Sequence, residues 1–228
     1  MVAGPSSRGL LQKLTDTDFS NQAFPWLSGQ NILIGGIETK AIRVNFVGEL
    51  GWELHHPIGR QNEIFDALFE VGEEFDLRPF GIRAMDSLRL EKSYRLIPRE
   101  LSIEYSALES GLEKFVAMDK EEFIGKSGLG DWKQHGFKWG FVTLEVSGIL
   151  DADPRGSEPI YHRDSGLIGR CTSGGYGWRV GRSIALGMVY ADHAKLGAEL
   201  EIEILGKRFS AIVIPESPFD PENKRLRS

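Results

Sequence analysis

The chain contains one cysteine, Cys171, among its 228 residues, which excludes an internal disulfide bond and a cysteine-based zinc cluster. Long apolar runs are missing as well, since no stretch approaches the roughly 18–20 residues of a membrane-spanning helix. The opening segment, MVAGPSSRGL, lacks the charged region and the apolar core of a signal peptide. These absences predict a soluble protein of a reducing compartment, which means the cytoplasm, or the mitochondrial matrix in a eukaryote.

The chain has fewer basic than acidic residues, with 27 Lys and Arg against 33 Asp and Glu, which gives a formal charge of −6. A general nucleic-acid binder needs a basic face that replaces the counterions on phosphates, so this class is disfavoured. An apolar fraction of 41% is enough for a packed core and excludes wholesale disorder. The length allows one large domain or two small ones.

Signatures of nucleotide, metal and nucleophile chemistry are absent. Neither Gly-x-Gly-x-x-Gly nor Gly-x-x-x-x-Gly-Lys-Ser/Thr occurs, and the nearest glycine cluster, residues 174–177, is interpreted as a turn between two β segments. His55 and His56 are neighbours on an expected strand and point to opposite faces, and no Cys-x-x-Cys or His-x-x-x-His exists, so no metal site is expected. Without an activating motif, Cys171 is interpreted as a small buried hydrophobe.

Hydrophobic periodicity predicts two successive parts. Helices are expected over 6–13, 61–75 and 83–92, and residues 31–57 read as strands with a hairpin turn at Gly35-Gly36. From Phe137 onward nearly every segment alternates in the manner of a strand, most cleanly over 199–205. We therefore expect an α+β part over 1–131, followed by a small all-β barrel over 137–228.

Glu53 is the most informative charged residue. It follows a turn bracketed by Gly48 and Gly51 and lies between apolar Trp52 and Leu54, so the strand is expected to be largely covered. An unpaired buried carboxylate is costly. Two interpretations follow: Glu53 pairs with Arg83 or Arg89, or it accepts hydrogen bonds from a ligand with two parallel N–H donors, such as the edge of a 2-amino-4-oxo-pteridine.

Several stretches in order along the chain point to one family. They are Val2–Pro5 with Ser7-Arg8, Gly48–Glu53, Asp86–Lys92, Phe123–Lys126, Thr172–Tyr176 and Pro215–Arg227. Together they resemble the folate-binding, aminomethyltransferase-like domain of the glycine-cleavage T-protein, which also forms the C-terminal part of dimethylglycine and sarcosine dehydrogenases. Gly-Glu-Leu-Gly-Trp-Glu-Leu-His and Thr-Ser-Gly-Gly-Tyr-Gly look closer to the dehydrogenase branch.

The resemblance implies an α+β aminomethyltransferase-like fold, with 1–131 as the C-terminal portion of the folate-binding domain and 137–228 as the C-terminal β-barrel domain. It further implies that tetrahydrofolate binds in a central cavity and that Glu53 binds its pterin. The implied chemistry is transfer of a one-carbon unit from a small N-methyl amine or an aminomethyl donor to folate. The flavin part of such dehydrogenases has no counterpart here, so we expect no FAD in this chain.

The chain departs from the family pattern at several positions of the implied folate site. Phe46 and Phe219 stand where the family commonly has tyrosine, and Met85 stands where T-proteins have arginine, with Arg83 two residues earlier. By resemblance we expect Glu53, Phe46, Arg83 and Phe219 to bind folate. The family's catalytic aspartate has no counterpart after Met1, so we expect a domain truncated at its N-terminus, name no catalytic residue and leave enzymatic activity open.

Two other functions remain from the sequence. The chain is a non-catalytic folate-binding or docking module that a partner chain or a second copy completes, or it is an iron–sulfur maintenance factor of the same superfamily. The latter branch is marked by Lys-Gly-Cys-Tyr-x-Gly-Gln, and the corresponding residues 119–126 contain no cysteine. The iron–sulfur function is therefore the least favoured.

Overall fold

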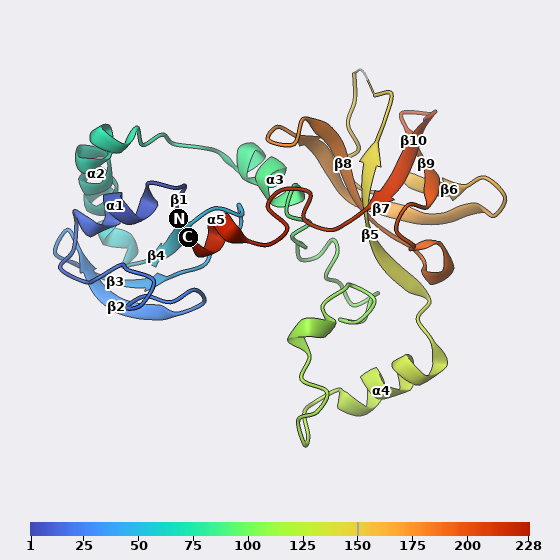
Figure 1. Cartoon of the computed structure of the whole chain (residues 1–228), viewed down its shortest axis with the longest axis horizontal. Helices are drawn as coiled ribbons and strands as arrows, with labels where there is room; N and C mark the ends of the chain where they lie inside the picture. Colours follow the sequence, from blue (N-terminus) through green and yellow to red (C-terminus); the bar gives the residue numbers. More distant parts are fainter. Residues whose placement is uncertain (150) are drawn as a thin grey trace. The chain divides into compact units, whose positions relative to one another are not determined.

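The computed structural model describes residues 1–149 and 151–228 and divides into two units (Figure 1). Unit 1 comprises residues 1–89 and 220–228, and unit 2 comprises residues 90–219. The C-terminal segment of the chain thus belongs with its N-terminal part. None of the helices described in these ranges is long and apolar enough to cross a membrane.

Unit 1 is built on an antiparallel sheet with the strand order β1-β4-β3-β2. The predicted hairpin is confirmed: β2 pairs with β3 through Gly35 and Gly36, whose φ angles of 55° and 78° suit the tight turn. The elements of the unit are β1 (Val2–Ala3), α1 (Ser7–Gln12), β2 (Gly29–Ile34), β3 (Ile37–Ile42), β4 (Gly51–His55), η1 (Ile58–Arg60), α2 (Gln61–Gly72), η2 (Glu73–Phe75), α3 (Ile82–Leu90, whose last residue belongs to unit 2) and α5 (Lys224–Arg227).

An aromatic cluster forms the centre of the core of unit 1. The ring of Trp52 is fully buried and lies 5.0 Å from that of Phe19 and 6.0 Å from that of Phe24, both in edge-to-face contact. Leu10 and Leu11 of α1 pack into the same cluster. The short helix predicted near the N-terminus is therefore held by tertiary packing, because six residues are too few for an isolated helix.

Gly51 sits where β4 passes closest to β1. A Cβ atom there would lie 2.6 Å from the carbonyl oxygen of Val2, which is backbone and cannot rotate away. Gly51→Ala is therefore expected to lower the free energy of unfolding by about 1–3 kcal/mol, the usual cost of overpacking. Urea denaturation measures this change, with Gly59→Ala as a control because a Cβ at Gly59 meets nothing within 4 Å. Equal stability of the two variants would contradict the prediction.

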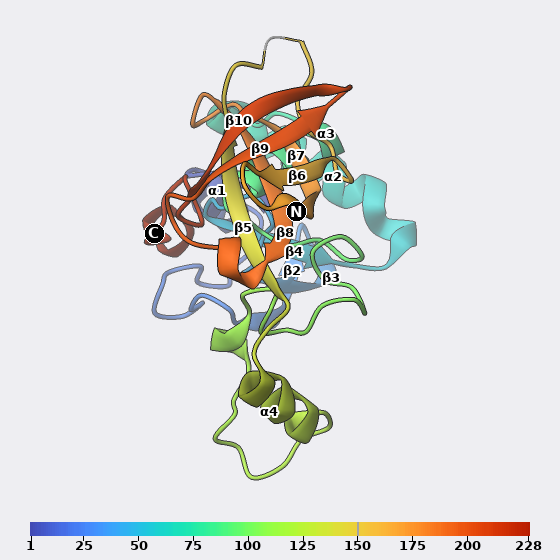
Figure 2. The same ribbon diagram turned by 90° about the vertical axis from the view of Figure 1, so that its right-hand side faces the viewer.

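Unit 2 contains a closed barrel of six strands in the order β10-β5-β8-β7-β6-β9, which confirms the predicted small all-β barrel (Figure 2). Alternate residues of each strand fill its interior, as Val142, Leu144 and Val146 do on β5. The elements are η3 (Glu113–Phe115), α4 (Lys126–His135), β5 (Trp139–Val146), β6 (Pro159–His162), β7 (Gly166–Gly177), β8 (Arg182–Tyr190), η4 (Ala191–His193), β9 (Glu199–Ile204) and β10 (Lys207–Ile214).

The glycine cluster at 174–177 is not the predicted turn. It forms the end of β7, paired with β8 along its length. Close packing explains these glycines: a Cβ at Gly174 would lie 2.6 Å from the carbonyl oxygen of Pro154, and one at Gly177 would lie 3.0 Å from Cγ of Glu91. The sequence pattern predicted that these glycines serve a turn, whereas close packing along a strand requires them.

Candidate functional site

The side chain of Asn45 holds the turn between β3 and β4. Its Oδ1 accepts hydrogen bonds from the backbone N–H groups of Val47 and Gly48, both at 3.0 Å, and its Nδ2 donates to the carbonyl of Glu49 at 2.5 Å. Gly48 has a φ of 72°, a conformation that favours glycine. Phe46 is half-buried within this turn.

Glu53 lies on the outer side of β4 and is more exposed than the sequence suggested. Its side chain is 40% exposed, and its Oε2 lies 3.1 Å from Nε2 of His55. Residues two apart on a strand share a face, so Glu53 and His55 point together away from the core that Trp52 and Leu54 contact.

The expected pairing of Glu53 with Arg83 or Arg89 is corrected by these contacts. Glu53 is in hydrogen-bond contact with His55, while Nε of Arg89 pairs with Oδ1 of Asp86 at 2.7 Å. The latter contact is a pairing that the i,i+3 spacing on a helix favours. Arg83 is exposed near the start of α3.

The four residues predicted to bind folate fall in both units. Phe46 and Glu53 belong to the β3–β4 turn and to the strand that follows it, and Arg83 belongs to α3 of unit 1. Phe219 belongs to unit 2, where it is half-buried next to the end of β10.

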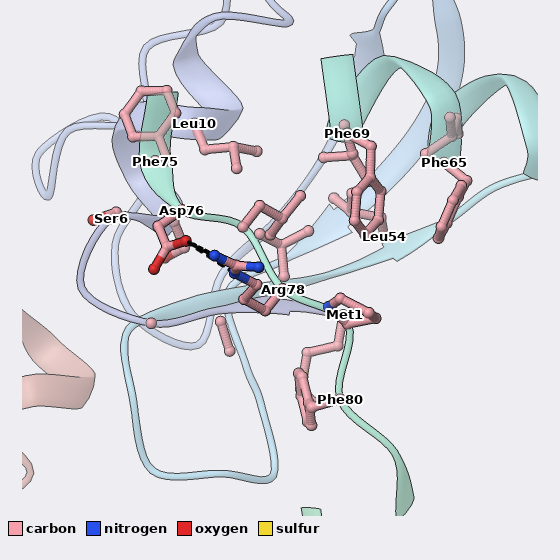
Figure 3. Close-up of a pocket in the computed structure, with 18 of the residues that line it drawn as sticks. Met1, Ser6, Leu10, Leu54, Phe65, Phe69, Phe75, Asp76, Arg78 and Phe80 are labelled. Atoms are coloured by element: carbon pink, nitrogen blue, oxygen red, sulfur yellow. Dashed lines mark hydrogen bonds and ion pairs between the residues drawn. The ribbon is translucent and has the colours of Figure 1, made fainter. Parts of the chain in front are cut away.

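An apolar cavity of about 760 Å³ opens on the other side of β4 (Figure 3). Leu54 lines it, whereas Glu53 does not, as the alternation along the strand requires. Phe65 and Phe69 of α2 are stacked at its wall with ring centres 4.3 Å apart. The Asp76–Arg78 ion pair, visible at the opposite side in Figure 3, adds charge at its rim.

The turn held by Asn45 and the contact of His55 with Glu53 were not predicted from the sequence, although each left a signal. An asparagine three residues before a glycine is typical of a side chain that caps its own turn. His55 follows Glu53 at the spacing that places two strand residues on one face. His162 and His193 are far apart in sequence, yet their ring centres lie 4.6 Å apart at the barrel surface.

Cys171 confirms its interpretation as a buried hydrophobe. It lies in β7, is 1% exposed and donates a hydrogen bond from Sγ to the carbonyl of Ser173 at 3.1 Å. Burial, together with the negative charge of Glu158, raises the pKa of the thiol well above its usual range. A thiol in this environment is unsuited to act as a nucleophile.

Comparisons with known proteins agree with this architecture. Residues 1–120 match the GCVT N-terminal domain, and residues 140–220 match the glycine cleavage T-protein C-terminal barrel domain. The chain is 38% identical over 229 residues to mitochondrial dimethylglycine dehydrogenase of Homo sapiens, covering 99% of this chain and 26% of that protein. It is 36% identical to an aminomethyltransferase of Thermoanaerobacter sp. (strain X514), covering 98% of this chain and 60% of that protein.

A solved structure shares the fold. The glycine cleavage system aminomethyltransferase T from Bartonella henselae superposes with a TM-score of 0.79 at 22% identity, covering 94% of this chain and 57% of that one. The chain thus spans about a quarter of the dehydrogenase and about 60% of the aminomethyltransferases that it matches. The predicted α+β fold followed by a barrel is confirmed, and the chain belongs to the glycine cleavage T-protein family.

Proposed function

We propose that this chain is a tetrahydrofolate-dependent one-carbon transfer domain, which moves an aminomethyl or methyl group in a demethylating system of the dimethylglycine or sarcosine type. The names of its relatives support this proposal, and the carboxylate of Glu53 is the observation that carries it. That carboxylate stands on the open face of β4 at a position fixed by a rigid turn. We place the protein in the cytoplasm, or in the mitochondrial matrix of a eukaryote.

The hydrogen-bond acceptors of Glu53 suit the edge of a pterin. A carboxylate presents two acceptor oxygens, and the 2-amino-4-oxo edge of a pterin presents two parallel N–H donors, so a bidentate pair forms without rearrangement of either group. His55 holds Oε2 of Glu53 at 3.1 Å and so restricts the rotation of the carboxylate. A restricted acceptor loses less conformational entropy when a ligand binds.

Folate supplies the nucleophilic nitrogen that receives the one-carbon unit, and a small N-methyl amine or an aminomethyl donor supplies that unit. The residues of this chain would bind and orient the reactants and shield them from water. Glu53 would orient the pterin, and we propose Phe46, Arg83 and Phe219 as further folate-binding residues. We propose no FAD in this chain and no catalytic residue.

Replacement of Glu53 by glutamine tests the proposal. Glu53→Gln keeps the shape of the side chain but exchanges one acceptor for a donor, so the affinity for tetrahydrofolate should fall by about 1–3 kcal/mol, the cost of an impaired charged hydrogen bond. Calorimetric titration under anaerobic conditions measures this. Glu74→Gln is the matched control, because Glu74 is also a surface carboxylate of unit 1 with a basic partner, Lys13, at 3.1 Å. If the native chain binds tetrahydrofolate and Glu53→Gln binds it equally well, Glu53 has no such role.

A second candidate function is a non-catalytic module that docks to a partner chain or to a second copy. The apolar cavity favours it, since Phe65 is 52% exposed and Phe80 is 45% exposed at its rim. The same titration separates the two candidates. A native chain that does not bind tetrahydrofolate leaves the docking module as the better function.

A further inference from the structure

We propose that His162 and His193 form a binding site for one divalent late transition-metal ion, such as Cu²⁺, at the surface of the barrel. This inference is independent of the proposed function, and both residues belong to unit 2. No local spacing in the sequence could indicate the pair, because His162 ends β6 and His193 ends η4.

Both histidines are carried by backbone that is held in place. His162 is paired with Gly166 across the β6–β7 hairpin. The short helix that carries His193 is anchored to the segment before β5, since the backbone N–H of Ala191 donates to the carbonyl of Lys138 at 3.1 Å. Two ligands on a fixed backbone lose little conformational freedom when they bind one ion, so together they bind it more tightly than either does alone.

The spacing of the two rings suits a shared ion. Their centres lie 4.6 Å apart, and their planes are inclined by 39°. With a metal–nitrogen bond of about 2.0–2.1 Å, two imidazoles in neighbouring positions on one ion have ring centres about 4.5–5 Å apart. Rotation of the two side chains is therefore enough to bring both rings to one ion, and the backbone does not have to move.

The rings are accessible and have little to give up. Both are half-buried and line a cavity of about 880 Å³, which leaves room for an ion and its waters. Among the residues that the structure describes, one hydrogen bond reaches either ring: the N–H of Asp164 donates to Nδ1 of His162 at 3.3 Å. A hydrogen bond of this length is weak, so its loss costs little when an ion binds.

The pair supplies two protein ligands, and water completes the coordination shell. In the described part of the chain, no group of three or more His, Cys, Asp or Glu side chains could hold a metal ion. Asp164 and Asp192 line the same cavity, but Arg163 and Lys195 line it as well and offset their charge. The imidazoles therefore select the ion. They favour Cu²⁺, Ni²⁺ and Zn²⁺, with Cu²⁺ bound most tightly, whereas Mg²⁺ and Ca²⁺ require oxygen ligands.

Calorimetric titration with Cu²⁺ at about pH 7.5, where an ordinary histidine is neutral, tests the proposal. His162→Asn and His193→Asn should each weaken Cu²⁺ binding about tenfold to hundredfold, because each leaves a single imidazole. The electron paramagnetic resonance spectrum of the bound Cu²⁺ should show splitting from two nitrogens in the native chain and from one in each variant. His135→Asn is the matched control, since Nδ1 of His135 contacts a carbonyl of its own helix, α4 of the same unit.

Each outcome decides the proposal. A native chain that binds Cu²⁺ no more tightly than either variant, or a loss in only one of the two variants, would overturn it. Displacement of Cu²⁺ by an excess of Mg²⁺ would also overturn it, because carboxylates would then hold the ion. Thermal melting without metal establishes that the variants fold, and His162→Gln replaces His162→Asn if the latter does not. The titration involves no folate, so a failure here leaves the proposed function intact.

Discussion

Trp52→Ala is expected to unfold unit 1 while the barrel of unit 2 stays folded. The side chain of Trp52 is fully buried against Phe19 and Phe24, and alanine leaves a cavity that these rings cannot fill. Substitutions of this size cost about 3–5 kcal/mol. Domains have a total stability of about 5–15 kcal/mol, so the loss removes a large share of what holds unit 1 together.

A second effect adds to the cavity. The guanidinium of Arg43, which is 1% exposed, lies 5.5 Å from the centre of the Trp52 ring, and burial lowers the pKa of Arg43. The indole face is one of the few groups that stabilise this buried charge. The substitution by alanine removes the indole. Arg43 then keeps its hydrogen bonds to the carbonyls of Phe24 and Ser228, at 2.8 Å and 3.0 Å.

Hydrogen exchange followed by mass spectrometry resolves the two units. In Trp52→Ala the amides of β2, β3 and β4 should lose protection, while those of β5 and β8 should keep it, because each unit has its own apolar core. Trp132→Ala is the control, since Trp132 on α4 is 44% exposed and contributes to neither core. Native protection of β2–β4 in Trp52→Ala would show that the indole is not needed for this core.

The parts of the fold that the sequence predicted are those governed by alternation. On β9, Leu200, Ile202 and Ile204 face the barrel interior while glutamates alternate with them, and a pattern of period two has no other stable arrangement. The hairpin at Gly35-Gly36 was equally local, since two successive residues with positive φ define the turn. Both features depend only on neighbours in the sequence.

Most of what the sequence did not reveal depends on contacts between distant segments. Gly174 is glycine because Pro154 approaches it, and nothing near position 174 in the sequence announces that approach. The partner of Glu53 is a neighbour in the sequence, yet the apolar residues on either side of Glu53 favoured an arginine from a later helix over His55. The Glu91–Arg179 contact joins residues 88 positions apart, so no local pattern could propose it.

Native Cys171 is expected to react with a thiol reagent at least about a thousandfold more slowly than in the urea-unfolded chain. The thiol is 1% exposed inside the barrel, and its raised pKa keeps it in the unreactive protonated form. Labelling then requires the barrel to open, and about 5 kcal/mol of stability corresponds to a labelling ratio above a thousandfold. Trp52→Ala should leave the native rate unchanged, because its cavity lies in unit 1. Fast labelling of the native chain at pH 7 would show that β7 opens without unfolding.

The same thiol makes the stability of the barrel depend on pH, and the sign follows from its pKa. An unfolded cysteine titrates near about 8.5, whereas the pKa of native Cys171 is raised, so above about pH 8.5 the unfolded chain has lost a proton that the native chain keeps. The unfolded state then binds fewer protons, and the free energy of unfolding falls as pH rises through this window. Below about pH 8.5 both states carry the proton, so this thiol then has no unfavourable effect on the free energy of unfolding. Urea denaturation at about pH 7 and about pH 10 measures the difference, and Cys171→Ala should lose the part of it that the thiol contributes. All other groups titrate alike in the native chain and in Cys171→Ala. An identical pH dependence of the two free energies of unfolding would therefore mean that the thiolate is accommodated within the folded barrel.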